Sequence, residues 1–300
     1  MKSFISIITG LFISLFVLVS CSNSNGKADA YGNFEATEIV VSAEGNGKLM
    51  AFDVNEGDLL IQNTVVGFID TIPLGLKREL LLATKEITAS KSKGVLSQIK
   101  VLNAQKNILN TNKTRIENLL KDNAATQKQL DDVQGELGVI QQQIRNIEIQ
   151  NAPVIKELKS LDIQIRQLDD QIQKSIIRNP INGTVLTTFT EPQEVTAYGK
   201  PLYKIADLST MQLRVYVSET QLAEIKIGQQ VTVKVDEGSG MSSHPGIVTW
   251  IASEAEFTPK IIQTKEERVA LVYAVKVDVP NEKGSLKIGM PAEMWFNVNE

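Results

Sequence analysis

The chain has 300 residues, a formal net charge of -4, 42% hydrophobic residues and only 5% aromatic residues. This composition disfavours a single large core. The net negative charge, without a long basic run, excludes the basic surface on which nucleic-acid-binding proteins depend. One histidine and one cysteine cannot supply the usual His and Cys ligands of a metal site, so we expect no metal and no cofactor, with carboxylate-only sites left open.

The first twenty residues are typical of an export signal, because Lys2 precedes an apolar run from Phe4 to Val19. A retained transmembrane helix is the alternative, but this run of 16 residues contains three polar ones and is short for a membrane span. The sequence Leu-Val-Ser-Cys, ending at Cys21, resembles a bacterial lipobox, which implies that Cys21 becomes a lipidated N terminus; a free thiol is the other interpretation. Residues 22–30 are polar and without periodicity, which predicts a flexible tether.

Two segments of 24 residues repeat without a gap at an offset of 136, namely residues 47–70 and 183–206. Glycine, apolar and turn positions coincide along the whole repeat; Gly47 matches Gly183, for example. Alternating apolar residues predict short strands, and residues 55–58 have the composition of a turn. The repeat therefore predicts two halves of one β-sandwich.

The two copies differ at two turn positions. Gly57 matches Gln193, so we expect the second turn to be made differently from the first. Asn63 matches Gly199, and this exchange is compatible with a shared conformation because asparagine tolerates positive φ.

Between the copies, the apolar period changes from two to about 3.5, which predicts an inserted antiparallel coiled coil. Asn151 interrupts the seam of the second arm, and Pro153 is expected to kink that helix without ending it. The second arm's seam comprises Leu130, Val133, Leu137, Ile140, Ile144, Ile147, Val154, Leu158, Leu161, Ile165, Leu168 and Ile172. A weaker seam in the first arm comprises Val95, Ile99, Leu102, Leu109, Ile116 and Leu120, with Lys106 and Lys113 between them.

The turn of this hairpin is predicted at residues 122–125, with Thr126 capping the second helix. Each arm has about 50 residues, which at about 1.5 Å per residue makes a rod roughly 70 Å long. Such a rod is too long to pack sideways on a small sandwich, so it must project into solvent or meet other rods.

From Leu208 the chain returns to short alternating segments, which predict a small β-barrel. We expect a helical piece from Glu219 to Ile225 to close one end of it. The strands are expected at residues 212–217, 230–235, 246–251, 271–279 and 292–298. The single histidine, His244, is expected in a surface turn rather than as a catalytic base.

This order of parts resembles the HlyD-type periplasmic adaptor, or membrane fusion protein, family over residues 34–298. The two repeats look like lipoyl-domain halves, and residues 176–185 look like the return from the hairpin into the lipoyl domain. Residues 215–219 and 227–231 look like the family's barrel, and residues 257–260, 263–268 and 289–291 resemble adaptors that serve ABC-type exporters. The resemblance implies an elongated α+β protein: a split lipoyl-like β-sandwich with an inserted α-helical coiled-coil hairpin, then a small β-barrel.

The domain boundaries that follow are a signal peptide at 1–20, a lipid anchor and linker at 21–33, lipoyl-like halves at 34–73 and 179–207, the hairpin at 74–178 and the barrel at 208–300. A further membrane-proximal domain, found in many adaptors, is not expected after the barrel.

The most specific match lies at the hairpin tip. Adaptors that meet a TolC-type channel carry an Arg, a Leu four later, a Ser seven beyond and a Leu four further on; here these positions hold Arg115, Leu119, Thr126 and Leu130. The resemblance implies that these four residues contact an outer-membrane channel, with threonine in place of serine. Without the family resemblance, the alternative interpretation is that Leu119 and Leu130 are ordinary coiled-coil residues and that Arg115 is a solvated charge.

The resemblance implies a non-enzymatic protein of the periplasm that is anchored to a membrane through Cys21; the inner membrane is favoured, and the outer membrane is the alternative left open. Its implied partners are an inner-membrane exporter of ABC type, a TolC-type outer-membrane channel and further copies of itself in a ring, by family resemblance a hexamer. Two other functions are open. A lipoyl or biotinyl carrier needs a lysine on a tight turn between the halves, where this chain has the hairpin, and a structural coiled-coil protein needs neither barrel nor lipobox.

Overall fold

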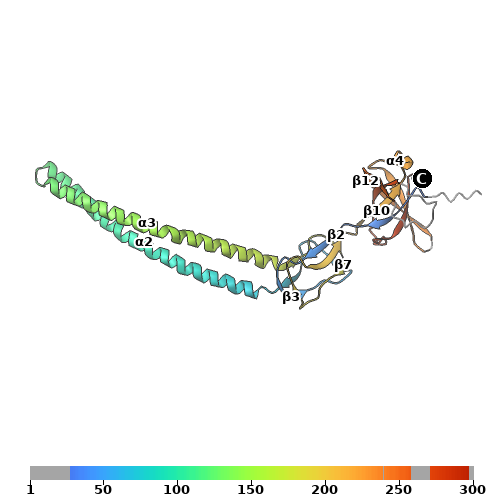
Figure 1. The fold of residues 1–300 in the computed structure, drawn as a ribbon, viewed down its shortest axis with the longest axis horizontal. Helices are drawn as coiled ribbons and strands as arrows, with labels where there is room; N and C mark the ends of the chain where they lie inside the picture. Colours follow the sequence, from blue (N-terminus) through green and yellow to red (C-terminus); the bar gives the residue numbers. More distant parts are fainter. Residues whose placement is uncertain (1–27, 239, 258–270, 297–300) are drawn as a thin grey trace, which may run out of the picture. The chain divides into compact units, whose positions relative to one another are not determined.

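The computed structural model describes residues 28–238, 240–257 and 271–296 (Figure 1). The predicted signal peptide, Cys21 and the exporter-type motif at 263–268 lie outside these residues. The chain forms two compact units, one from Glu38–Ala206 and the other from the segments on either side, up to Thr37 and from Asp207.

The first unit contains the predicted split sandwich, built as two four-stranded sheets with the orders β2-β9-β7-β4 and β6-β5-β3-β8. Each half of the repeat places its short middle strand, β4 or β8, in the sheet of the other half. The strands are β2 (Glu38–Ser42), β3 (Gly47–Phe52), β4 (Leu59–Leu60), β5 (Val65–Ile69), β6 (Ile176–Arg178), β7 (Gly183–Thr188), β8 (Val195–Thr196) and β9 (Pro201–Ala206).

Hydrogen bonds repeat between the halves at the same offset as the sequence. The amide of Val185 donates to the carbonyl of Asp58 at 2.9 Å, and that of Leu49 donates to the carbonyl of Glu194 at 2.8 Å. The core repeats too, because Leu49 and its counterpart Val185 are both buried. The repeat therefore corresponds to a pseudo-twofold structure.

The expectation of a different second turn is wrong. Gln193 has φ 75°, the same left-handed conformation as its counterpart Gly57 at φ 91°. Its amide donates to the carbonyl of Leu49 at 2.7 Å, and its side-chain amide donates to the carbonyl of Met50 at 3.1 Å. These two bonds hold a conformation that a glutamine disfavours when it is not constrained.

The hairpin consists of helices α2 (Ile72–Lys121) and α3 (Gln127–Lys174), and α3 continues through Pro153. The hairpin is therefore shorter at its base than predicted, because β6 belongs to the sandwich sheet, where it pairs with β5. The predicted seam of α3 is buried or half-buried at every position. Its fully buried members are Val133, Leu137, Asn151, Leu161, Ile165 and Leu168.

The seam of α2 near the sandwich is polar, which the apolar pattern did not reveal. Arg78 Nε lies 2.6 Å from Asp169 Oδ1, and Lys85 Nζ lies 2.6 Å from Asp162 Oδ1. These two pairs join α2 to α3 across the seam. They also define the antiparallel register of the two helices, because the second pair lies seven residues closer to the tip than the first on both α2 and α3.

The second unit is a closed barrel of six strands in the cyclic order β10-β1-β15-β11-β12-β14, with the short β13 added beside β14. A barrel was predicted, and Ile225 after the short helix α4 (Glu219–Leu222) enters its core. The strands are β1 (Ala30–Glu35), β10 (Thr210–Val217), β11 (Gln230–Asp236), β12 (Met241–Ile251), β13 (Glu256–Phe257), β14 (Leu271–Pro280) and β15 (Pro291–Trp295).

The predicted boundary at residue 34 needs correction, because β1 is a barrel strand rather than part of the tether and the sandwich. It pairs with β10 on one side and with β15 on the other. The backbones of β1 and β10 approach each other so closely that position 32 requires glycine, because a Cβ at Gly32 would lie 1.9 Å from the carbonyl oxygen of Arg214. Long-range pairing therefore decides which domain this strand joins.

Candidate functional site

The hairpin tip is a tight turn between two capped helix ends. Asn123 has φ 59°, and the amide of Ala124 donates to the carbonyl of Leu119 at 2.7 Å. A left-handed residue followed by such a bond closes the C terminus of a helix, and asparagine tolerates that conformation. The turn lies where the sequence predicts it.

Thr126 caps α3, as predicted, through a capping box. Its side chain accepts from the amide of Gln129 at 3.4 Å, while its own amide donates to Gln129 Oε1 at 2.8 Å. Sequence reasoning missed Gln129, although a Thr followed three residues later by Gln is the signature of this motif. The Thr126 hydroxyl therefore has a structural task, and a serine at the same place could perform it.

The four tip residues predicted to contact a channel differ in exposure. Arg115 and Leu119 are exposed on the last turns of α2, with Leu119 40% exposed, whereas Leu130 is half-buried in the seam of α3. Within the described part of the chain, Arg115 makes no salt bridge, while Lys113 pairs with Glu117 on the same helix. Arg115 and Leu119 therefore offer a charge and an apolar contact to a partner more directly than Leu130.

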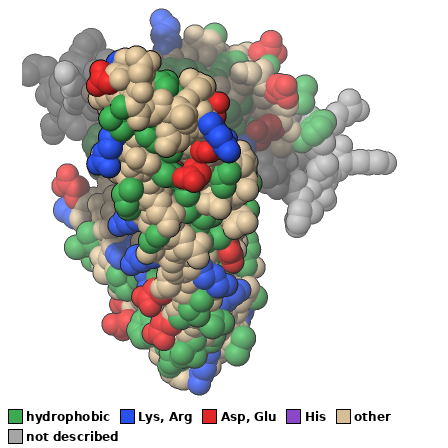
Figure 2. Space-filling model, turned by 90° about the vertical axis from the view of Figure 1, so that its left-hand side faces the viewer, with side chains coloured by type: hydrophobic (Ala, Val, Ile, Leu, Met, Phe, Trp, Pro, Cys, Tyr) green, Lys and Arg blue, Asp and Glu red, His purple; other side chains and the backbone are tan. Residues whose placement is uncertain are grey.

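The surface around the tip carries charges of both signs. Figure 2, which faces the tip end, shows basic, acidic and apolar side chains interspersed rather than a patch of one sign. A partner at this end would be selected by the positions of individual groups rather than by a broad electrostatic field.

The return from the hairpin into the sandwich is organised by Asn179, which sequence reasoning did not single out. The side-chain amide of this buried residue donates to the carbonyl of Ile61 at 3.1 Å and to that of Ile181, and its Oδ1 accepts from the Tyr203 hydroxyl at 3.0 Å. Burial raises the pKa of Tyr203 to about 12. The neutral hydroxyl donates this bond, so the network is complete at ordinary pH.

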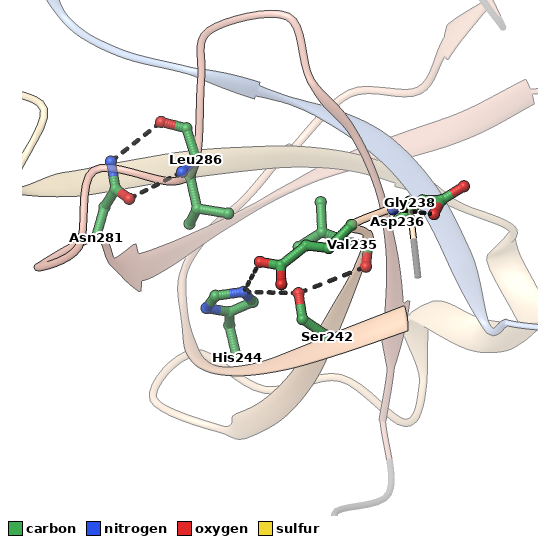
Figure 3. A network of polar contacts seen from close by, with 8 residues as sticks. Val235, Asp236, Gly238, Ser242, His244, Asn281 and Leu286 are labelled. Carbon is green, nitrogen blue, oxygen red and sulfur yellow. Dashed lines mark hydrogen bonds and ion pairs between the residues drawn. The ribbon is translucent and has the colours of Figure 1, made fainter. Parts of the chain in front are cut away.

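His244 lies in strand β12 opposite Val233, so the predicted surface turn is wrong. Its Nε2 is 3.1 Å from Ser242 Oγ and 4.0 Å from Glu237 Oε1. Figure 3 shows the His244 ring beside Ser242. In a hydrolase triad the acid holds one ring nitrogen while the other receives the serine proton. Here both contacts converge on one nitrogen, so this cluster does not have the geometry of a triad.

The junction between the sandwich halves has no place for a carrier lysine. Strand β5 ends at Ile69 and α2 begins at Ile72, so the chain enters the hairpin directly instead of making a tight turn. Where a lipoyl or biotinyl carrier needs a tight turn, this chain has the hairpin, with 50 residues in α2 and 48 in α3.

The two edges of the sandwich carry exposed apolar side chains at matching positions of the repeat. Leu59 on β4 is 82% exposed, and its counterpart Val195 on β8 is 71% exposed. The amide of Asn63, after β4, donates to the carbonyl of Asn179, just after β6, at 2.8 Å, and the amide of Gly199, after β8, donates to the carbonyl of Ala43, just after β2, at 2.8 Å. Leu59 and Val195 therefore lie at opposite edges, one closed by β4 and β6 and the other by β2 and β8.

The described residues contain neither a helix long and apolar enough to cross a membrane nor a group of three His, Cys, Asp or Glu side chains suited to a metal ion. The predicted signal peptide lies outside the described residues.

No protein family model matches the chain. It is 25% identical to the UPF0194 membrane protein YbhG of Salmonella gallinarum, covering 97% of both proteins, and 33% identical to a UPF0194 membrane protein of Acidithiobacillus ferridurans over 40% of this chain and 36% of that protein. The crystal structure of MacA from Actinobacillus actinomycetemcomitans matches with a TM-score of 0.57 and 20% identity, over 88% of this chain and 76% of that chain. The chain is thus a relative of YbhG along its length and shares the fold of MacA.

Proposed function

We propose that this protein is a periplasmic adaptor of the HlyD type that links an inner-membrane exporter of ABC class to a TolC-type outer-membrane channel and forms part of the conduit between them. The observation that carries the proposal is the long hairpin inserted between the two sandwich halves, with a capped tip that presents Arg115 and Leu119. A rod of this length, about 75 Å for α2 at about 1.5 Å per residue, suits a part that reaches away from a small β-domain.

The similarity to the membrane protein YbhG along the chain and the fold shared with MacA support this proposal. The barrel supports it over a purely structural coiled-coil protein, which has no need for a second folded unit. A lipoyl or biotinyl carrier function is not supported, because the chain enters the hairpin between the sandwich halves instead of making the tight turn on which a carrier lysine lies. The proposal requires no substrate-binding pocket in this chain, because an adaptor that forms part of a conduit need not select the substrate that passes through it.

Attachment to the inner membrane is proposed through lipidated Cys21, on the basis of the lipobox-like sequence that ends there. The lipid replaces a membrane span as the anchor of the mature chain. Cys21→Ala should leave the protein without an acyl mass and with its leader uncleaved. Mass spectrometry of the membrane-extracted protein checks this, and a mature N terminus elsewhere without lipid would remove the anchor.

Self-association is proposed because one hairpin cannot enclose a conduit, and family resemblance suggests six copies. The exposed apolar residues at opposite sandwich edges, Leu59 on one and Val195 on the other, support contacts between unlike edges of neighbouring copies. Contacts of this head-to-tail kind generate rings when the rotation closes. Crosslinking in membranes that contain the exporter should trap oligomers, and a strictly monomeric protein there would contradict the ring.

The proposed channel contact is tested with Arg115→Asp. At a desolvated contact, reversing this charge should cost about 2 to 5 kcal/mol of binding and abolish export. At an exposed helix position it should change the free energy of unfolding by only about 0.5 kcal/mol. Export, recovery of the channel with the adaptor, and thermal melting of the purified variant are measured together.

The matched control is Arg145→Asp, which reverses an exposed arginine on α3 whose one side-chain partner among the described residues is Gln142 of the same helix. This variant should export normally. Thr126→Ser should also export normally, because serine keeps both the hydroxyl and the cap. Normal export from Arg115→Asp, or equal losses from both charge reversals, would show that the tip is not the contact.

A further inference from the structure

The middle of the hairpin differs from its two ends in the kind of residue that its seam buries. The buried apolar residues of α3 form two groups, Val133 with Leu137 toward the tip and Leu161 to Leu168 toward the sandwich. Between the groups the only buried residue of α3 is Asn151, which is 4% exposed. The seam of α3 therefore has two stretches with fully buried apolar residues, separated by a stretch in which the apolar residues are only half-buried.

Asn151 is also unsatisfied. Its Oδ1 is buried and has no hydrogen-bond partner among the described residues. In the register set by the two ion pairs near the sandwich, the two buried residues of α2, Thr88 and Ser92, lie about two turns and one turn closer to the sandwich than the level of Asn151. An amide oxygen that gives up its bond to water without replacement weakens the packed state, so this part of the seam gains little from remaining closed.

Two residues that weaken a helical backbone, Gly94 on α2 and Pro153 on α3, lie at the same level of the hairpin. Pro153 lacks the amide that would bond the carbonyl of Ile149, and Gly94 has a low intrinsic preference for helix. The register set by the Arg78–Asp169 and Lys85–Asp162 pairs places Gly94 opposite Pro153. Packing does not demand this glycine, since a Cβ there would meet nothing within 4 Å.

The helices also leave a groove next to this level. A hollow of about 450 Å³ lies between them on the tip side, formed by Gln98, Val101, Leu102, Gln143, Asn146 and Ile147. This hollow is a groove open to solvent, so the surface beside the seam is incompletely covered by side chains here.

We propose that the hairpin contains a hinge at the level of Gly94, Asn151 and Pro153, which joins a stiff base segment to a stiff tip segment. The base segment is held by its two ion pairs and by the buried group around Ile165. The tip segment is held by Val133 and Leu137. About 27 residues of α2 lie beyond the hinge, a lever of about 40 Å, so a bend of about 10° moves the tip by about 7 Å.

The hinge is a property of the hairpin itself and does not depend on the proposed adaptor function. It gives the tip residues a range of positions while the base keeps its place on the sandwich. In an adaptor, this motion would let the tip meet a channel whose distance or tilt varies.

Hydrogen exchange of the full-length protein in detergent tests the hinge directly. Amides at residues 90–98 and 149–157 should exchange at least tenfold faster than helical amides of the base and tip segments. The stiffened variant Gly94→Ala/Asn151→Leu/Pro153→Ala should slow exchange in these two stretches at least tenfold. The matched control, Gly138→Ala, also fills open space on a helix, but it lies in the tip segment and should leave the two stretches unchanged.

Distances between spin labels provide a second test. With Cys21 replaced by serine, labels at Ile87 and Asn118 span the hinge, and labels at Val101 and Asn118 lie within the tip segment; all three positions are exposed. The spanning pair should give the broader distance distribution, and the stiffened variant should narrow it to the width of the control pair. Uniform exchange along both helices, or equally narrow distributions for both pairs in the wild type, would overturn the hinge whatever the outcome of the export experiments.

Discussion

The barrel and the hairpin bury apolar side chains to different depths. Most core residues of the barrel, such as Leu213 and Val277, are completely inaccessible to solvent, whereas α2 buries no apolar residue fully. A closed sheet surrounds its interior, but a helix in a two-helix rod has only one neighbour to cover it. Stability in the barrel should therefore depend strongly on single side chains, and in the hairpin it should be distributed over many weak contacts.

The largest difference is expected from truncating a leucine in each region. Leu213→Ala should lower the free energy of unfolding of the barrel by about 4 kcal/mol, because it leaves a cavity in a closed core. Leu109→Ala in the half-buried seam of α2 should cost only about 1 kcal/mol, since water fills the space. Denaturant unfolding followed by region-specific hydrogen exchange measures both, and equal costs would contradict the contrast.

Glycine substitutions should sharpen the same comparison. Gly32→Ala should destabilise the barrel by about 3 kcal/mol, because the new Cβ would collide with the backbone of β10. Gly138→Ala in α3 should instead stabilise the hairpin by about 0.5 to 1 kcal/mol, because its Cβ meets open space and alanine favours helix. Thermal melting of the two variants gives the signs, and a tolerated alanine at Gly32 would show that β1 can move away from β10.

The smallest effect concerns the sandwich at high pH. The pKa of Tyr203 is raised by burial to about 12, above its ordinary value of 10.0. The unfolded chain therefore releases this proton first, so the contribution to stability is complete below about pH 10 and is lost as pH rises from 10 to 12. Phenolate absorbance should show one of the five tyrosines titrating near pH 12, and Tyr203→Phe should remove that step. Absence of the late step in the wild type would contradict the burial argument.

Among the candidate sites, the tip was the most accessible to sequence reasoning. The turn at 122–125 and the cap at Thr126 depend on residues a few positions apart, so local chemistry specifies them. The exposure difference between Leu119 and Leu130 depends on which face of each helix meets the other, and the Asn179 network joins residues more than 100 positions apart. Neither has a local signature strong enough to identify it.

The sequence by itself determined the parts that rest on periodicity: the repeat at an offset of 136, the heptad seam of α3 and the return to alternating strands after Leu208. Only the tertiary structure decided where distant segments pair. It placed β1 in the barrel, exchanged β4 and β8 between the two sheets, and joined Arg78 to Asp169. It also held Gln193 in a left-handed conformation through bonds to Leu49 and Met50. The physical reason is that periodicity shows which face of a segment is buried but not which segment covers it, and partners across the chain can override a local backbone preference.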